Sequence, residues 1–242
     1  MKNILVHAAA FCTLLAIASV CTSCKEEVMR GKGNITTEGR TLQQFDKVII
    51  DVAADATIEV GKPYAVEVKA QGNLMEHIKT EVTGNTLHIY NDGIIFNSSD
   101  IDIIVQVPSI TALELKGAAD VHTTGDIKGA DFKLEVLGAS EVDIDELHVD
   151  NLDVKLSGAS ELQINRGTVG KAKYKVTGAG EIRAEGVETK EVAARVSGAG
   201  EMNLFVTEKL DADITGAGEI SYKGHPQVTS DVTGAGELID KN

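Results

Sequence analysis

Apolar and polar residues alternate along most of the chain, and the alternation has a period of two residues. It is clearest on both sides of a short glycine-containing tetrapeptide that recurs seven times. A period of two is typical of β-strands that bury one face. No comparable stripe with the period of an α-helix occurs, although residues 73–78 could form one helical turn. The pattern therefore predicts an all-β fold.

The spacing of the tetrapeptide predicts the architecture. Its first glycines are separated by 21, 20, 20, 20, 18 and 18 residues, and the positions two before and four after each glycine are apolar. The seven copies are Gly117–Asp120, Gly138–Glu141, Gly158–Glu161, Gly178–Glu181, Gly198–Glu201, Gly216–Glu219 and Gly234–Glu237. Copies that stay in phase predict one coil of a parallel β-solenoid per repeat, with equivalent residues stacked about 4.8 Å apart. Hairpins would reverse alternate copies and break the apolar columns, and the usual handedness of parallel crossovers predicts a right-handed β-helix.

The regular repeats occupy only part of the chain. Residues 113–242 are predicted to form the regular coils, and residues 40–112 a less regular β-rich half that caps the first coil. In this half, Thr83-Gly84-Asn85 predicts a hairpin turn, and Val52–Asp55 is a degenerate eighth copy of the tetrapeptide. Residues 238–242 are too few for a cap, which suggests that a partner subunit covers that end.

Residues 1–23 are predicted to be a signal peptide that is removed from the mature chain. The apolar stretch at 4–20 is short for a membrane span, and the small residues Thr22 and Ser23 precede Cys24. This arrangement resembles a bacterial lipoprotein signal. The resemblance implies that the chain is cleaved before Cys24, which then becomes the first residue of the mature protein and is acylated.

The residues after the cysteine bear on localisation. Residues 24–39 are expected to form a tether, and Lys25–Glu27 resembles the surface-export tag of lipoproteins from Bacteroides relatives. We therefore expect an outer-membrane, lipid-anchored protein exposed at the cell surface. The alternative to the lipoprotein is an ordinary secreted protein that is cut near Ser23. The alternative to the export tag is that Lys25–Glu27 is only a charged part of the tether.

Composition narrows the class of protein. The net charge is −14, from 23 Lys and Arg against 37 Asp and Glu, whereas nucleic-acid binding needs clustered basic residues, so no nucleic acid partner is expected. All three cysteines, Cys12, Cys21 and Cys24, belong to the signal, so the mature body is expected to have no disulfide, thiol nucleophile or cysteine metal site. Aromatic residues make up 4% of the chain, which leaves few platforms for sugar stacking.

The fourth position of every tetrapeptide is acidic, and stacking of the coils would align these carboxylates. We call this set the acidic column: Asp120, Glu141, Glu161, Glu181, Glu201, Glu219 and Glu237. Because Ca²⁺ takes oxygen ligands, a cation-binding stripe is one interpretation. The repeat lacks the nonapeptide spacing of calcium-binding β-rolls, so the other interpretation is an exposed column that points into water or accepts backbone hydrogen bonds.

The second position of every tetrapeptide is alanine. Alanines that face outward would form a flat strip that another surface can approach closely. We therefore name Ala159, Ala179, Ala199 and Ala217 as a candidate self-association interface. The alternative is that the bend breaks the alternation and alanine is simply the residue that fits.

The residues that could carry catalysis are scattered. The histidines beyond the signal stand singly and off the phase of the repeat: His77, His88, His122, His148 and His225. The motifs of serine hydrolases, zinc proteases and P-loop enzymes do not occur. A loose basic set comprises Arg166, Lys171, Lys173, Lys175 and Arg183. We predict no catalytic residues, no metal site and no cofactor.

Three features carry a resemblance to a known family: Phe45–Val48, Val107-Pro108 before the strand Leu113–Gly117, and the Gly-Ala-Gly-Glu repeats. Over residues 40–242 the chain resembles bacterial surface proteins described as putative auto-transporter adhesins with a β-helical head. The resemblance implies the same fold and an adhesive role, and it brings no catalytic residues with it.

The expected function is that of a non-enzymatic cell-envelope lipoprotein, either a surface adhesin or a structural β-helix scaffold. The expected partners are the membrane through the lipid anchor, a glycan or surface protein, and further copies of the same chain. A glycan-binding module and a polysaccharide-processing enzyme are the alternatives.

Overall fold

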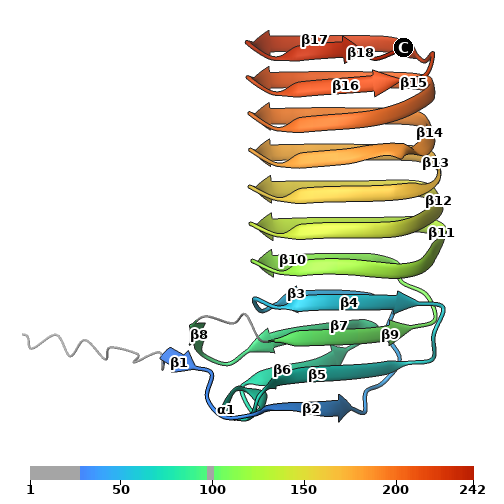
Figure 1. The fold of residues 1–242 in the computed structure, drawn as a ribbon. Helices are drawn as coiled ribbons and strands as arrows, with labels where there is room; N and C mark the ends of the chain where they lie inside the picture. The colour runs from blue at the N-terminus through green and yellow to red at the C-terminus, as the bar shows by residue number, and fades with distance from the viewer. Residues whose placement is uncertain (1–27, 97–100) are drawn as a thin grey trace, which may run out of the picture.

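The computed structural model describes residues 28–96 and 101–242, so the predicted signal peptide and Cys24 lie outside the described residues. Figure 1 shows a stack of β-coils with a less regular β half at one end. The helix α1 (Gly72–Met75) lies where one helical turn was predicted. In the described part of the chain, no helix is long and apolar enough to span a membrane.

The coils are parallel and in register, which confirms the predicted β-solenoid. Each of five long strands forms most of one coil: β11 (Asp120–Gly138), β12 (Glu141–Gly158), β13 (Glu161–Gly178), β14 (Glu181–Gly198) and β15 (Glu201–Gly216). Leu156 pairs with Val176, and Val176 pairs with Val196, so the apolar columns stack as the sequence predicts. Shorter strands begin and end the stack: β10 (Ala112–Gly117), β16 (Glu219–Lys223), β17 (Gln227–Gly234) and β18 (Glu237–Asp240).

The alternation within one coil is reset twice, which divides the coil into three segments. In β12 the consecutive residues Asp145-Glu146 and Asp150-Asn151 all face outward, while the residues beside them resume the alternation. We call these parts the first segment (141–145), the middle segment (146–150) and the last segment (151–158), and we use the same names for the other coils. The first 18-residue spacing arises because the register between β14 and β15 shifts in the middle segment. The next coil, formed by β16 and β17, keeps that shorter length without a further shift.

Two positions of the tetrapeptide are restricted by close backbone packing. Gly198 has φ +123°, and a Cβ there would lie 2.4 Å from the carbonyl oxygen of Gly178 in the preceding coil. The third position faces the interior, and a Cβ at Gly200 would lie 2.5 Å from Val176 Cγ1. Small residues are therefore required wherever one bend stacks directly on another.

The N-terminal half extends both sides of the solenoid and then closes its end. Parallel strands continue the stack: β3 (Lys47–Asp51), β4 (Asp55–Val60), β7 (Thr86–Asn91) and β9 (Asp102–Val107). Antiparallel strands follow them: β6 (Ile78–Thr83) pairs with β7 through the predicted hairpin, and β5 (Ala65–Gln71) pairs with β9. Further coils cannot be added in the same parallel register at this end.

The prediction that residues 24–39 form a tether is wrong from Val28 onward. Strand β1 (Val28–Arg30) pairs in parallel with β8 (Ile94–Phe96), and β2 (Ile35–Arg40) pairs in antiparallel with β5. The sequence of β2 contains a single large apolar residue, Ile35, and most of the strand is exposed. The alternation of apolar and polar residues therefore does not reveal this strand. It is held by backbone hydrogen bonds at an edge of the sheet and buries few side chains.

The opposite end of the stack has no cap among the described residues. Every residue of β17 is exposed, and Val228 and Val232 are 37% and 41% exposed. Their partners in the preceding coil, Leu210 and Ile214, are fully buried. The last coil therefore presents an unpaired strand edge and the open apolar interior.

One buried tyrosine is expected to make the stability of the solenoid depend on pH. Tyr174 is 2% exposed inside the stack, and its hydroxyl faces Thr189 but lacks a hydrogen bond of good geometry to any described residue. Burial raises the pKa of the Tyr174 phenol well above its ordinary value. The unfolded chain loses this proton near pH 10 while the folded chain keeps it.

The free energy of unfolding should therefore fall as the pH rises above 10, by up to about 1.4 kcal/mol per pH unit from this group. Tyr174→Phe should remove that part of the slope and leave stability at pH 7 equal or slightly higher. Urea unfolding between pH 7 and 11 measures both effects. Identical slopes for the two proteins would contradict the burial of the phenol.

Candidate functional site

The acidic column is longer than the sequence repeat indicates. Strand register continues it through Asp55 on β4 to Asp102 on β9, giving nine carboxylates in line. The seven predicted members all lie on it: Asp120, Glu141, Glu161, Glu181, Glu201, Glu219 and Glu237. The degenerate tetrapeptide had indicated Asp55. Asp102 was missed because no glycine and alanine precede it, although the alternation around it is the same.

Cations neutralise only parts of the acidic column. Arg183 forms ion pairs with both Glu161 and Glu181, and its Nε lies 2.6 Å from Glu181 Oε1. At the other end, Lys69 Nζ lies 2.5 Å from Asp102 Oδ2. The members of the column are exposed or half-exposed, so water reaches them. Calcium binding by the column stays a prediction.

The side of the solenoid formed by the first segments is mostly acidic. Beside the acidic column, the next outward positions add Asp143 and Asp145. The side formed by the last segments is mixed, because β13 contributes Lys171, Lys173 and Lys175 next to acidic residues of neighbouring coils. The negative charge of the protein is therefore unevenly distributed between two faces.

A concave pocket of about 560 Å³ lies where the acidic column enters the N-terminal half. Its lining includes Asp55, Asp102 and Asp120 of the column. It also includes His122, whose Nδ1 lies 3.3 Å from Asp143 Oδ2. The carboxylates of this lining could accept hydrogen bonds from a hydroxyl-rich group that binds beside the column.

The alanines of the tetrapeptide face outward. Ala159, Ala179, Ala199 and Ala217 are all exposed, whereas the residue after each of them is buried. Their backbones stack, as in the hydrogen bond from the Ala179 amide to the Gly158 carbonyl. The strip is available on the surface, and its use in self-association stays a prediction.

The loose basic set does not converge on one place. Arg166 lies on a middle segment and pairs with Asp145 and Glu146, at 3.0 Å and 3.2 Å. Lys171, with its neighbours on the last segment of β13, faces another side and lies 3.2 Å from Glu191. Arg183 lies on a first segment, at the outward position beside the acidic column. The groove of converging basic groups that a polysaccharide-processing enzyme would need is not formed by this set.

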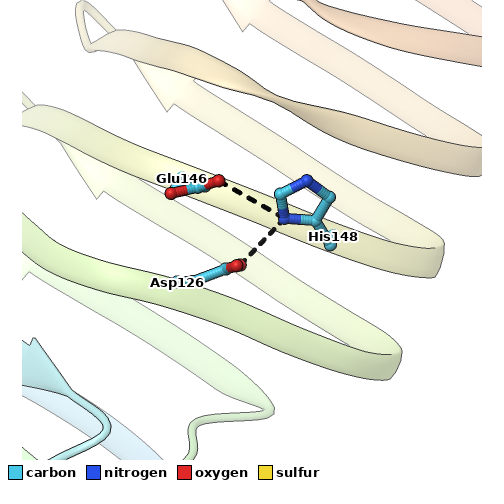
Figure 2. A group of neighbouring side chains, drawn as sticks. All are labelled: Asp126, Glu146 and His148. Atoms are coloured by element: carbon cyan, nitrogen blue, oxygen red, sulfur yellow. Dashed lines mark hydrogen bonds and ion pairs between the residues drawn. The ribbon is translucent and has the colours of Figure 1, made fainter.

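Sequence reasoning missed one group of side chains, Asp126, Glu146 and His148 (Figure 2). They come from the middle segments of β11 and β12, where Asp126 pairs with Glu146 in register. Partial burial alone would raise the pKa of the Asp126 carboxyl, but hydrogen bonds from Lys128 and His148 outweigh it and hold the pKa below its usual value. The alternation around His148 in the sequence indicates that its side chain faces outward. Only the strand register shows that Asp126 is its neighbour.

Together these features define the class of protein: a parallel β-solenoid with an exposed, largely acidic face built from repeated bends. The chain belongs to the family described as putative auto-transporter adhesins with a head GIN domain, which matches residues 44–226. This match confirms the resemblance that the sequence repeats carried. No curated protein matches the chain.

Solved structures share the fold. A putative adhesin from Bacteroides fragilis has a TM-score of 0.81 at 22% identity, over 88% of this chain and 99% of that one. A putative adhesin from Parabacteroides merdae has a TM-score of 0.73 at 22% identity, over 89% and 99%. A putative lipid binding protein from Parabacteroides distasonis has a TM-score of 0.73 at 23% identity, over 89% and 100%. The family and these neighbours are described as adhesins or binding proteins and not as enzymes.

Proposed function

We propose that this protein is a non-enzymatic adhesin that is anchored in the outer membrane by acylated Cys24 and displayed at the cell surface. Its elongated solenoid would contact a glycan or a surface protein along the acidic face. The observation that supports this function most directly is the repeated outward row of nine carboxylates on a rigid stack of coils. Repetition suits multivalent contact, in which many weak contacts add up.

A glycan array, probed with and without Ca²⁺, tests the proposed contact surface. A partner bound along the acidic face should be lost with the triple variant Glu181→Gln, Glu201→Gln and Glu219→Gln. The matched control, Asp211→Asn with Asp213→Asn, removes carboxylates from a last segment on the other side. Binding that needs Ca²⁺ would favour the glycan-binding module with a cation-bridged column. If no sugar is retained, the same variants are compared for adhesion to host cells, and equal adhesion by all of them would contradict the acidic face as the contact surface.

We also propose that two copies associate through the open end of the stack. The edge strand β17 carries a single charged residue, Asp231, and two exposed valines, whereas natural edge strands are usually protected by charges. In an antiparallel pairing centred on Ser230, Val228 of one copy lies opposite Val232 of the other. The closed antiparallel end of the N-terminal half would limit such an assembly to a dimer.

Light scattering coupled to size exclusion tests this association. The protein should elute as a dimer, and Val232→Lys should convert it to a monomer because a charge replaces an apolar contact at the open end. Thr233→Lys is the matched control, since this side chain points away from the interior. A monomeric parent protein, or a Val232→Lys variant that remains dimeric, would contradict the proposal.

A further inference from the structure

Asp126, Glu146 and His148 point at one another across two adjacent coils. One potential ligand atom from each lies within 4.8 Å of the other two. Asp126 Oδ1 is 2.9 Å from His148 Nδ1, and Glu146 Oε1 is 3.9 Å from the same nitrogen (Figure 2). Ligands of a tetrahedral zinc ion at bond lengths of about 2.0–2.2 Å lie about 3.4 Å apart. Small side-chain movements would therefore let these three atoms share one ion.

The far oxygen of each carboxylate is already held by a cation. Lys128 Nζ lies 2.7 Å from Asp126 Oδ2, and Arg166 Nη2 lies 3.2 Å from Glu146 Oε2. These contacts orient the carboxylates and leave Oδ1 and Oε1 on the side of His148. Hydrogen-bonded partners that orient the ligands in this way are a regular part of protein metal sites.

We propose that Asp126 Oδ1, Glu146 Oε1 and His148 Nδ1 bind one divalent transition-metal ion of the zinc type. Binding displaces the proton on Nδ1 to solvent, and a ring that was neutral takes up one proton at Nε2, so that the bound ring is the neutral Nε2–H tautomer. An imidazole nitrogen with two carboxylates suits zinc, whereas calcium takes oxygen ligands. Three protein ligands leave a fourth position for water or for a donor from a bound partner.

The other described histidines lack this arrangement. His77 also contacts two carboxylates, but it reaches Asp92 through Nδ1 and Glu76 through Nε2, and opposite ring nitrogens cannot ligate the same ion. His122 contacts one carboxylate, that of Asp143, through Nδ1. Because it too contacts an aspartate of a neighbouring coil, His122 is a matched control for His148.

The experiment uses the chain from Lys25 onward. This chain contains the whole described fold and lacks the three cysteines, whose thiolates would themselves bind zinc. Calorimetric titration with ZnCl₂, in the presence of excess CaCl₂, should show one saturable site per chain. His148→Ala and the isosteric Asp126→Asn should each weaken zinc binding at least tenfold, whereas His122→Ala should bind as the parent protein does.

A second readout separates loss of the site from loss of the fold. All variants should keep the far-ultraviolet circular dichroism of the parent protein, because the three substituted side chains are all at least partly exposed. Co²⁺ should give visible absorption bands with the parent protein and not with His148→Ala. The absence of saturable zinc binding in the micromolar range, equal affinities of the parent protein and His148→Ala, or displacement of zinc by calcium would each overturn the proposal. It does not depend on the adhesive function, since metal binding is measured without a partner.

Discussion

Gly198→Ala is expected to lower the melting temperature by roughly 6–12 °C. The backbone at Gly198 has φ +123°, a conformation that L-residues rarely adopt. The added Cβ would also lie 2.4 Å from the Gly178 carbonyl oxygen, which belongs to rigid backbone and cannot move aside without shifting the coil. Together the two effects should lower the free energy of unfolding by about 3 kcal/mol. For a chain of this size, each kcal/mol corresponds to about 2–4 °C in melting temperature.

Gly129→Ala is the matched control for this substitution. Gly129 lies in β11 and has no left-handed φ, and a Cβ there would meet no described atom within 4 Å. Thermal unfolding should therefore leave the melting temperature of this variant within a few degrees of the parent protein. Equal melting temperatures for Gly198→Ala and the parent protein would mean that successive bends do not stack as described.

Cys24→Ala is expected to release the protein from the membrane almost completely. Acyl chains contribute about 0.8 kcal/mol per buried methylene, and stable anchoring needs more than one chain. Without the acceptor cysteine these acyl chains are lost, and with them the energy that is proposed to hold the protein to the membrane. Fractionation of cells that express the full chain should move the protein from the membrane pellet to the soluble fraction.

Cys21→Ala is the control, because Cys21 precedes the proposed cleavage site and leaves with the signal. This variant should stay in the pellet and remain accessible to protease added to intact cells. A Cys24→Ala variant that stays in the pellet would contradict anchoring through Cys24, and a parent protein that is found in the medium would favour the ordinary secreted protein over the lipoprotein.

The coil architecture was predictable from the sequence because the relevant signals are local and repeated. Leu156, Val176 and Val196 occupy the same place in successive repeats, and a period-two pattern on both sides leaves only a parallel stack as the way to bury them together. The hairpin at Thr83-Gly84-Asn85 was also predictable, because a short turn between two alternating stretches has few other solutions. The structure settled one question that the sequence left open, namely that the alanines face outward.

The missed features depend on register and on edge pairing. Apolar and polar residues do not alternate clearly in strand β2, which forms because the edge of β5 is available for pairing. Its own sequence therefore carries little information about it. Asp126 and His148 are 22 residues apart, and whether they meet depends on the register shift after Thr123. A one-residue change in that shift would turn either side chain to another face. Sites built across coils are therefore harder to predict than the coils themselves.

Disulfide formation between paired cysteines tests most directly whether each repeat makes one coil. In the chain from Lys25 onward, which has no cysteine, Thr177→Cys and Ser197→Cys introduce two exposed thiols at positions that pair directly in adjacent coils. Their Cα atoms should lie about 4.8 Å apart, within the range that a disulfide bridges, whereas Ser157→Cys with Ser197→Cys spans two coils at about 9.6 Å. We expect mild oxidation to close the first pair in nearly all molecules and to leave the second pair reduced. A second pair that closes as readily, or a first pair that stays reduced, would contradict the parallel solenoid.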